Sequence, residues 1–553
     1  MQQIADKSAE AGCGQVAGGG VALPPGSALF GMGRQSLPVR IPALPASFWP
    51  RAEQALRHEY AGAAYSHDVG QWHESRSEAG KQWRLWRSPL QESPLATLFR
   101  RGLANEGRRD DPAMQALAQR LLSRRRITVE FVGGSVTAAG LTQPFGFANR
   151  FLTWLNRAFP TQDGSPHVAI ATSALSGATA DFSRTCRQFS EVGRGAIDLV
   201  VVELAVNLGY AGPEAVDLLL RAYMHLPSAP AIIVLNWMQS RFGAGSMPGA
   251  PLGPSNATRE ALLTSAARQR GLIAWSSMGA FWELFEWNKT RCSPCCCSGA
   301  ADLIFLDGRH PTAVGHALIA TILIDLLRPS LERADSPILA PPRTPSPSSS
   351  RRSSIGQARA GVTATTAAHD SSSTSSLLLG RRHCLTGEAL RLASSTSPSD
   401  AGSFKWMVEH SMTNTQQPGF VSTLVGDTLD LRVPTGAAYA ILVYMQSYER
   451  IGSATLGCAG GCQCDGARLV GLNATERVST PILTRPLRLV HRPSDSTPCT
   501  LRVVNTGRLR GMRASSDKFK VLGLMTAVAS GGDGSWWQDA LLRHTARGPE
   551  LSR

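Results

Sequence analysis

The segment Ile127-Thr-Val-Glu-Phe-Val-Gly-Gly-Ser135 passes without a break from strand-forming residues into a glycine turn. β-Branched and aromatic side chains occupy most of positions 127–132, which predicts a buried strand. Gly133 and Gly134 then predict a tight turn, and Ser135 stands directly after it. We expect a helix to follow, as in a sheet whose strands alternate with helices.

The alternation of strands and helices continues on both sides of this segment. Helical patterns cover residues 113–122, 147–159, 213–224, 257–270 and 314–327, and strand patterns cover 167–171, 197–204, 231–235 and 272–275. The run 197–204 is almost wholly apolar, as expected of a strand that is buried on both faces. We therefore predict an α/β domain over residues 95–330, with a parallel sheet flanked by helices.

The rest of the chain differs in composition. Residues 1–94 carry Gly, Pro, Ser and Arg without sustained periodicity, and we expect a poorly ordered leader there, with some local structure around Trp72–Trp86. Residues 331–400 are rich in Ser, Pro and Thr with few aromatics, which predicts a disordered linker. Residues 401–530 hold short apolar runs split by turn residues, which predicts an all-β sandwich domain, and residues 531–553 are expected to be a C-terminal tail.

Composition bounds the classes of partner. The chain has 553 residues, 43% of them hydrophobic, and a formal net charge of +15. The basic residues form no stripe with interleaved aromatics and no zinc-finger, RRM or KH pattern, so we expect no nucleic-acid partner. No apolar stretch approaches the roughly 20 residues that span a bilayer, so no transmembrane segment is expected. The oligomeric state is left open.

The spacing of cysteines in the last quarter of the chain is informative. Cys458, Cys462 and Cys464, with a distant Cys499, are typical of a disulfide framework, which implies an oxidising compartment. Glycosylation sequons point to the secretory pathway or the cell exterior, whereas the first residues show no signal peptide, so the localisation stays open.

A second group of cysteines, Cys292, Cys295, Cys296 and Cys297, lies just before residue 300. No second pair follows at zinc-finger spacing, so we expect no metal site. Two alternatives remain for this insert, a loop stapled by disulfides and an artefact of gene prediction.

Ser135 is the first candidate for chemistry. A residue in this turn stands at the carboxyl edge of a parallel sheet, where open α/β folds bind ligands. The following helix would direct backbone N–H groups and its positive dipole end at this position, which suits an oxyanion or a phosphate. The alternative is that the two glycines serve only the backbone of the turn.

The second candidate pair is in Asp307-Gly-Arg-His310-Pro, before the last helix. Asp307 is placed to accept the Nδ1 proton of His310, which leaves Nε2 to remove a hydroxyl proton. A serine nucleophile needs such a base. The alternative is that Asp307 only caps the turn. His316, one turn into the apolar helix, is expected to be packed rather than to act as the base.

Two more residues follow predicted strands. Gly177 comes after the second strand, where its bare backbone N–H can approach an oxyanion, and Asn207 comes after the third, where its amide can donate a hydrogen bond. Either one alone fits an ordinary turn residue. Together with Ser135 and the His310 loop, however, they converge on one edge of the sheet.

The order Ser, Gly, Asn, Asp-x-x-His resembles the four-block signature of the SGNH (GDSL-like) hydrolases over residues 95–330. Residues 133–138 are similar to the first block in the glycine-glycine-serine form of plant and algal members. Residues 444–452 and the Cys458–Cys464 pattern resemble the β-sandwich that follows the hydrolase domain in that group.

This resemblance implies a flavodoxin-like sheet with Ser135 as nucleophile. It implies an oxyanion hole made by the Ser135 N–H, the Gly177 N–H and the Asn207 side chain. His310 would be the general base, and Asp307 its orienting acid.

The chain departs from the family pattern in two places. Leu208 stands where an Asp usually follows Asn207, and Ala205 stands where a Gly is usual. That Asp often stabilises the turn rather than reacting, so its loss bears more on the geometry than on the chemistry.

The residues together predict a serine esterase that works through an acyl-enzyme without cofactor or metal. Its substrate would be a small ester or an acylated glycan, for example one that it deacetylates. One alternative is an O-acyltransferase on glycans that uses the same serine. Another is a non-catalytic glycan- or partner-binding protein that retains the fold.

Overall fold

The computed structural model describes most of both predicted domains. The described residues are 45, 47–60, 71–72, 86–87, 93–107, 111–170, 174–189, 197–207, 213–237, 254–277, 279–281, 284, 303–306, 310–336, 382–395, 403–410, 416–448, 450–473, 479–492, 497–509, 511 and 515–528.

A six-stranded sheet forms the centre of the first part, in the order β3-β8-β7-β6-β4-β5. Its parallel strands are β4 (Thr128–Gly133), β5 (Val168–Ile170), β6 (Leu199–Glu203), β7 (Ala231–Asn236) and β8 (Ile273–Ser276). Numbered along the chain, these five lie in the order 2-1-3-4-5, which is the flavodoxin-like order and confirms the predicted class. One edge was not predicted, because β3 (Leu103–Glu106) pairs antiparallel with β8.

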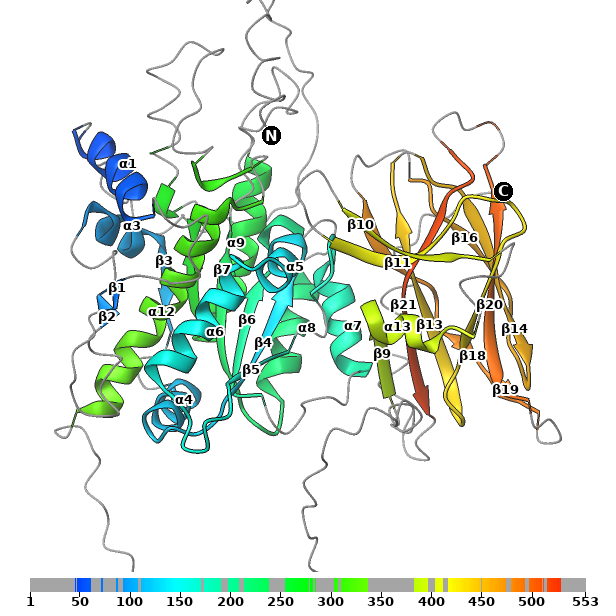
Figure 1. Ribbon diagram of the computed structural model, residues 1–553, viewed down its shortest axis with the longest axis horizontal. Coiled ribbons are helices and arrows are strands. Elements are labelled where there is room, and N and C mark those ends of the chain that lie inside the picture. The colour runs from blue at the N-terminus through cyan, green and yellow to red at the C-terminus, as the bar shows by residue number, and fades with distance from the viewer. Residues whose placement is uncertain are drawn as a thin grey trace, which may run out of the picture.

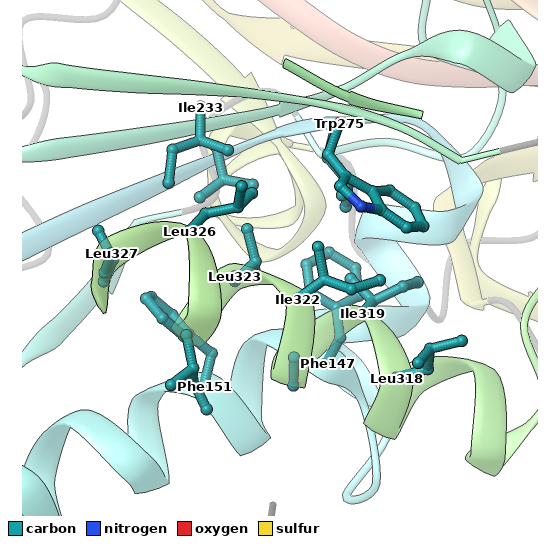
Figure 2. Close-up of a cluster of buried hydrophobic side chains, with 14 of the residues drawn as sticks. Phe147, Phe151, Ile233, Trp275, Leu318, Ile319, Ile322, Leu323, Leu326 and Leu327 are labelled. Atoms are coloured by element: carbon teal, nitrogen blue, oxygen red, sulfur yellow. The ribbon is translucent and has the colours of Figure 1, made fainter. Parts of the chain in front are cut away.

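Helices cover both faces of this sheet. They are α4 (Pro112–Leu122), α5 (Ser135–Thr142), α6 (Phe147–Ala158), α7 (Ala180–Phe189), α8 (Pro213–Met224), α9 (Pro254–Gln269) and α12 (Ala313–Asp335). Alternation along each strand sends Val129 and Phe131 to the core beneath α4, α6 and α12, while Val132 faces the core beneath α8 and α9. Figure 2 shows the first of these cores, where Ile319, Ile322 and neighbours on α12 pack between the sheet and α6.

Helix α12 resembles a membrane-spanning helix in its length and composition. Among the described residues it is the one helix that is long and apolar enough to cross a bilayer, with 23 residues. Most of it is buried inside the protein, where it serves as a core helix.

The second part is antiparallel. One sheet has the order β10-β11-β21-β13-β17, with β18 on β13 and β9 on β21, and another has the order β12-β20-β14-β16. Their inner faces share one hydrophobic core, so this is a two-sheet sandwich as predicted. The strands are β9 (Arg382–Thr386), β10 (Lys405–His410), β11 (Gln416–Ser422), β12 (Thr428–Arg432), β13 (Ala437–Gln446), β14 (Ser453–Gly460), β15 (Cys462–Gln463), β16 (Ala467–Val470), β17 (Thr480–Leu483), β18 (Leu487–Arg488), β19 (Val490–His491), β20 (Cys499–Gly507) and β21 (Phe519–Val528).

Three expected boundaries require correction. Strand β9 and helix α13 (Gly387–Ala393) lie within residues 331–400, the expected linker, because β9 pairs with β21 and Leu390 is buried in the sandwich core. Helix α1 (Phe48–Glu59) lies within the expected leader. One face of this helix buries Trp49 and Leu56 against the first core. Helix α12 also continues to Asp335, past the expected end of the domain.

The two parts are covalently and non-covalently joined. A disulfide links Cys186 of α7 to Cys384 of β9 across 198 positions of sequence, and α7 lies beside β9 in Figure 1. Phe182 of α7 packs in one cluster with Met445 and Leu522 of the sandwich. The predicted disulfide framework is confirmed as Cys458–Cys464 and Cys462–Cys499, whereas Cys292 to Cys297 lie outside the described residues.

Candidate active site

Ser135 begins helix α5 directly after β4 and is 6% exposed. The two glycines before it are needed for close packing. A Cβ on Gly133 would lie 2.3 Å from the carbonyl oxygen of Glu203 on β6, and one on Gly134 would overlap the side chain of Asn207. The turn therefore sits directly against the end of the neighbouring strand, and it presents Ser135 at the point where the strand order reverses.

His310 meets Ser135 from the other end of the sequence. Its Nε2 lies 2.7 Å from Ser135 Oγ, a hydrogen-bond distance. Backbone hydrogen bonds fix the described residues around His310, from Leu306 N–H to the His310 carbonyl (2.8 Å) and from Thr312 N–H to the Ile304 carbonyl (2.9 Å). The Thr312 hydroxyl then caps α12 by accepting from the Gly315 N–H at 3.1 Å.

Asp307 lies outside the described residues, and so does Leu208. The structure therefore leaves the orienting role of Asp307 as a prediction.

Asn207 ends a short 3-10 turn (Ala205–Asn207) after β6. Its backbone N–H donates to the Leu204 carbonyl at 2.9 Å, which folds the chain back over the strand end. A Cβ on Gly134 would lie 1.2 Å from Asn207 Nδ2, so the amide nitrogen rests on the glycine that precedes Ser135. Ala205 is buried at the start of this turn, where the family pattern has glycine.

Gly177 lies in the loop between β5 and α7, at the same carboxyl end of the sheet. Its φ is +81°, in the left-handed region that favours glycine. The Ala178 N–H closes this turn on the Leu175 carbonyl at 2.8 Å. On its outer side the loop touches the sandwich, since Gln417 Nε2 donates to the Ser176 carbonyl at 3.3 Å.

The predicted residues thus fall into two groups. Direct contacts bring Ser135, His310 and Asn207 together around the turn after β4. Gly177 lies at the same edge of the sheet. The chain continues from it into α7, which is anchored to the sandwich.

Glu203 is a residue that the sequence analysis missed. It ends β6, is completely buried, and accepts a hydrogen bond from the Thr137 hydroxyl at 3.1 Å. Burial raises the pKa of Glu203 to about 8, although the Thr137 bond opposes this shift. Within the described residues, its Oε1 has no hydrogen-bond partner. An acidic residue directly after the apolar run 199–202 was the available signal.

His316 is packed, as predicted. It is 1% exposed, and its Nδ1 accepts from the Phe147 N–H at 3.4 Å. Burial, with smaller effects of the Arg150 and His310 charges, lowers the pKa of His316 to about 3. A histidine that stays neutral inside the core is not placed to exchange protons with a substrate.

Groups suited to nucleophile chemistry converge at the site. Within the described part of the chain, no group of three or more His, Cys, Asp or Glu side chains is placed to hold a metal ion. What converges is a hydroxyl, an imidazole nitrogen in contact with it, an amide side chain and the amino-terminal end of α5.

No family model matches the chain, and no curated protein matches it. Among solved structures it is similar to a two-domain esterase active on acetylated mannans, co-crystallised with mannopentaose (TM-score 0.40, 16% identity, 78% of this chain and 99% of that one). It is also similar to a peptidoglycan O-acetylesterase (TM-score 0.30, 12% identity, 41% and 98%) and to a putative acylhydrolase from Bacteroides fragilis (TM-score 0.24, 16% identity, 39% and 95%). At these scores the similarities do not identify the reaction, for which the geometry of the site is the guide.

Proposed function

We propose that this protein is a serine esterase of the SGNH type, of the plant and algal form, that hydrolyses esters through an acyl-enzyme on Ser135. The observation that carries the proposal is the 2.7 Å contact between His310 Nε2 and Ser135 Oγ. A serine hydroxyl becomes a competent nucleophile when such a base removes its proton.

The first half of the reaction follows from this contact. His310 Nε2 takes the proton of Ser135 as Oγ attacks the ester carbonyl, and Asp307 holds the Nδ1 proton of the imidazole. The negative charge moves to the carbonyl oxygen, where the Ser135 N–H, the Gly177 N–H and the Asn207 amide donate to it. When the intermediate collapses, the C–O bond breaks and the leaving alcohol takes the proton from His310.

The second half regenerates the enzyme. Water attacks the acyl group on Ser135 while His310 Nε2 accepts its proton, and the carboxylic acid leaves as Oγ recovers a proton from His310. No cofactor or metal takes part in this scheme. We propose an acylated glycan as the substrate class. Removal of its acetyl group would leave a free sugar hydroxyl.

The same acyl-enzyme allows a second outcome. If a sugar hydroxyl replaces water in the second half, the protein is an O-acyltransferase, and the residues around Ser135 serve both reactions equally.

The test measures hydrolysis of p-nitrophenyl acetate, longer acyl esters and an acetylated mannan by the full chain and its Ser135→Ala variant. We expect kcat to fall by about 10³-fold or more in the variant, because no other group supplies the attacking oxygen. The matched control is Ser183→Ala on α7, since Ser183 is also buried and its hydroxyl has no partner within the described residues.

Each outcome separates the candidate functions. Hydrolysis that depends on Ser135 supports the esterase. Acetyl transfer to an added oligosaccharide with little hydrolysis favours the transferase. Activity that is the same in Ser135→Ala rejects the proposal, and binding of the mannan without any turnover favours the non-catalytic alternative.

A further inference from the structure

The carbonyl group of Ser176 and the N–H of Gly177 belong to one peptide unit. A trans peptide is planar, with its C=O and N–H pointing in opposite directions. Whatever binds the Ser176 carbonyl therefore fixes the direction in which the Gly177 N–H points. In this chain that partner comes from the sandwich, because Gln417 Nε2 of β11 donates to the Ser176 carbonyl at 3.3 Å.

Gln417 is itself held by a buried lysine. Lys520 Nζ donates to the backbone carbonyl of Gln417 at 2.8 Å and to its Oε1 at 3.5 Å. An ammonium group only donates hydrogen bonds, so it faces the oxygen end of the side-chain amide and leaves Nε2 for the Ser176 carbonyl.

Lys520 pairs with a nearby carboxylate, which it shares with Lys518. It is 1% exposed, and its Nζ lies 2.7 Å from Glu409 Oε2 on β10. Glu409 is opposite Gln417 in the β10–β11 register, and Val421, four residues after Gln417 on β11, is opposite Lys520. The pKa of Lys520 is lowered, because burial outweighs the hydrogen bond and the charge of Glu409, which raise it. Phe420 and Val521 point into the core of the sandwich, so the three side chains form one connected group on the opposite face of the sheet, the face turned toward the first part of the chain.

The sandwich also limits movement of the glycine. A Cβ on Gly177 would lie 2.8 Å from the Ser479 carbonyl oxygen and 3.1 Å from Pro481 Cδ. Backbone from the second part of the chain therefore closes over one side of Gly177. On the other side, no residue within the described ranges accepts a hydrogen bond from the Gly177 N–H.

We propose that Gln417 is a positioning residue for the oxyanion hole, so that the sandwich completes the active site of the first part. The inference rests on the proposed function, because it assigns Gln417 the task of aiming the Gly177 N–H at the developing oxyanion. The hydrogen bond to the Ser176 carbonyl also polarises the peptide, which makes its N–H a better donor. Gln417 touches the loop and not the reacting atoms.

The experiment replaces Gln417 in the full chain and measures kcat and KM on p-nitrophenyl acetate, with a pH profile and a thermal melt. Gln417→Glu keeps the shape of the side chain but loses the donor, and Gln417→Met removes the donor without adding charge. We expect kcat to fall roughly 10- to 100-fold in both, less than the 10²–10³-fold cost of deleting an oxyanion donor. KM is expected to stay within about 2-fold and the pH profile to keep its shape, because acyl-group binding and His310 are untouched.

The control is Gln463→Glu, the same substitution at an exposed position of β15. We expect it to leave kcat unchanged. A merely structural role for Gln417 would instead lower the melting temperature and reduce the active fraction, with kcat per active site unchanged. Titration of active sites by the burst of p-nitrophenol measures that fraction.

Failure of this inference is distinct from failure of the proposed function. If Ser135→Ala abolishes hydrolysis while both Gln417 variants keep kcat per active site within about 2-fold, the positioning role is overturned and the esterase stands. If Ser135→Ala has no effect, the proposed function fails, and the role of Gln417 in it fails with it.

Discussion

Gly134 leaves the space that the amide of Asn207 fills, since a Cβ at Gly134 would lie 1.2 Å from Asn207 Nδ2. The φ of Gly134 is −95°, which other residues adopt, so its φ does not require a glycine. The requirement comes from the neighbouring strand end. The glycine before Ser135 and the asparagine after β6 are therefore one packing unit, and substitution of either one disturbs the other.

Gly134→Ala is expected to behave like loss of the Asn207 amide. The added methyl group must displace Asn207, so kcat on p-nitrophenyl acetate should fall by about 10²–10³-fold, the usual cost of one oxyanion donor. In Asn207→Ala, kcat should fall by a similar factor. In the double variant kcat should fall little further, because both changes remove the same interaction.

Steady-state kinetics of the three variants check this prediction. Gly457→Ala is the control, because a Cβ at Gly457 meets nothing within 4 Å. Losses that multiply in the double variant would show that Gly134 and Asn207 act independently.

Much of this site could be predicted from sequence because it depends on strand ends. Ser135 and Asn207 each follow a strand of a parallel sheet, and the carboxyl ends of parallel strands meet at one edge. Their shared position at this edge therefore followed from the order of elements, without any long-range pairing having to be known. His310 was found in the same way, through its place before the last helix.

The residues that the sequence analysis missed depend on contacts between distant segments. Gln417 reaches the Ser176 carbonyl across 241 positions, and Cys186 bonds to Cys384 across 198. No local pattern marks either pair. For the same reason β9 was placed in the linker, since the five residues 382–386 become a strand only when β21 pairs with them.

Glu203 makes stability depend on pH. Its pKa is about 8 in the folded protein against 4.5 ordinarily, so the folded state holds the proton more tightly. Its contribution to the free energy of unfolding is complete below about pH 4.5 and is lost as the pH rises to about 8. Glu203→Gln cannot ionise and keeps an acceptor for Thr137, so its melting temperature should fall less between pH 5 and pH 9.

Thermal melts at both pH values measure this effect. Between pH 5 and pH 9, we expect the melting temperature of the unchanged protein to fall by at least a few degrees more than that of Glu203→Gln. Glu388→Gln on α13 is the control, because that side chain is exposed and its pKa is lowered by Arg391, so it is ionised throughout this range. Equal losses in the unchanged protein and in Glu203→Gln would mean that Glu203 is ionised in the fold.

The Cys186–Cys384 disulfide is expected to support both stability and activity. Removing it with paired alanines opens a loop of 198 positions, which costs up to about 5 kcal/mol of unfolding free energy on the loop-entropy estimate. The Cys458–Cys464 disulfide closes a loop of only 6 positions, for which the same estimate is about 2 kcal/mol. Paired alanines at this second disulfide are thus a matched control of the same chemistry.

The two disulfides should also differ in their effect on kcat. Cys186 lies on α7, which leads directly from the Gly177 loop, and Cys384 lies on β9, next to β21. Loss of this bond loosens the contact through which the sandwich holds the loop, so kcat should fall, whereas loss of Cys458–Cys464 should leave it unchanged. Denaturant melts and esterase kinetics on both pairs decide the matter. If kcat is retained without Cys186–Cys384 while stability falls, the apolar cluster around Phe182 is sufficient to hold the two parts in register.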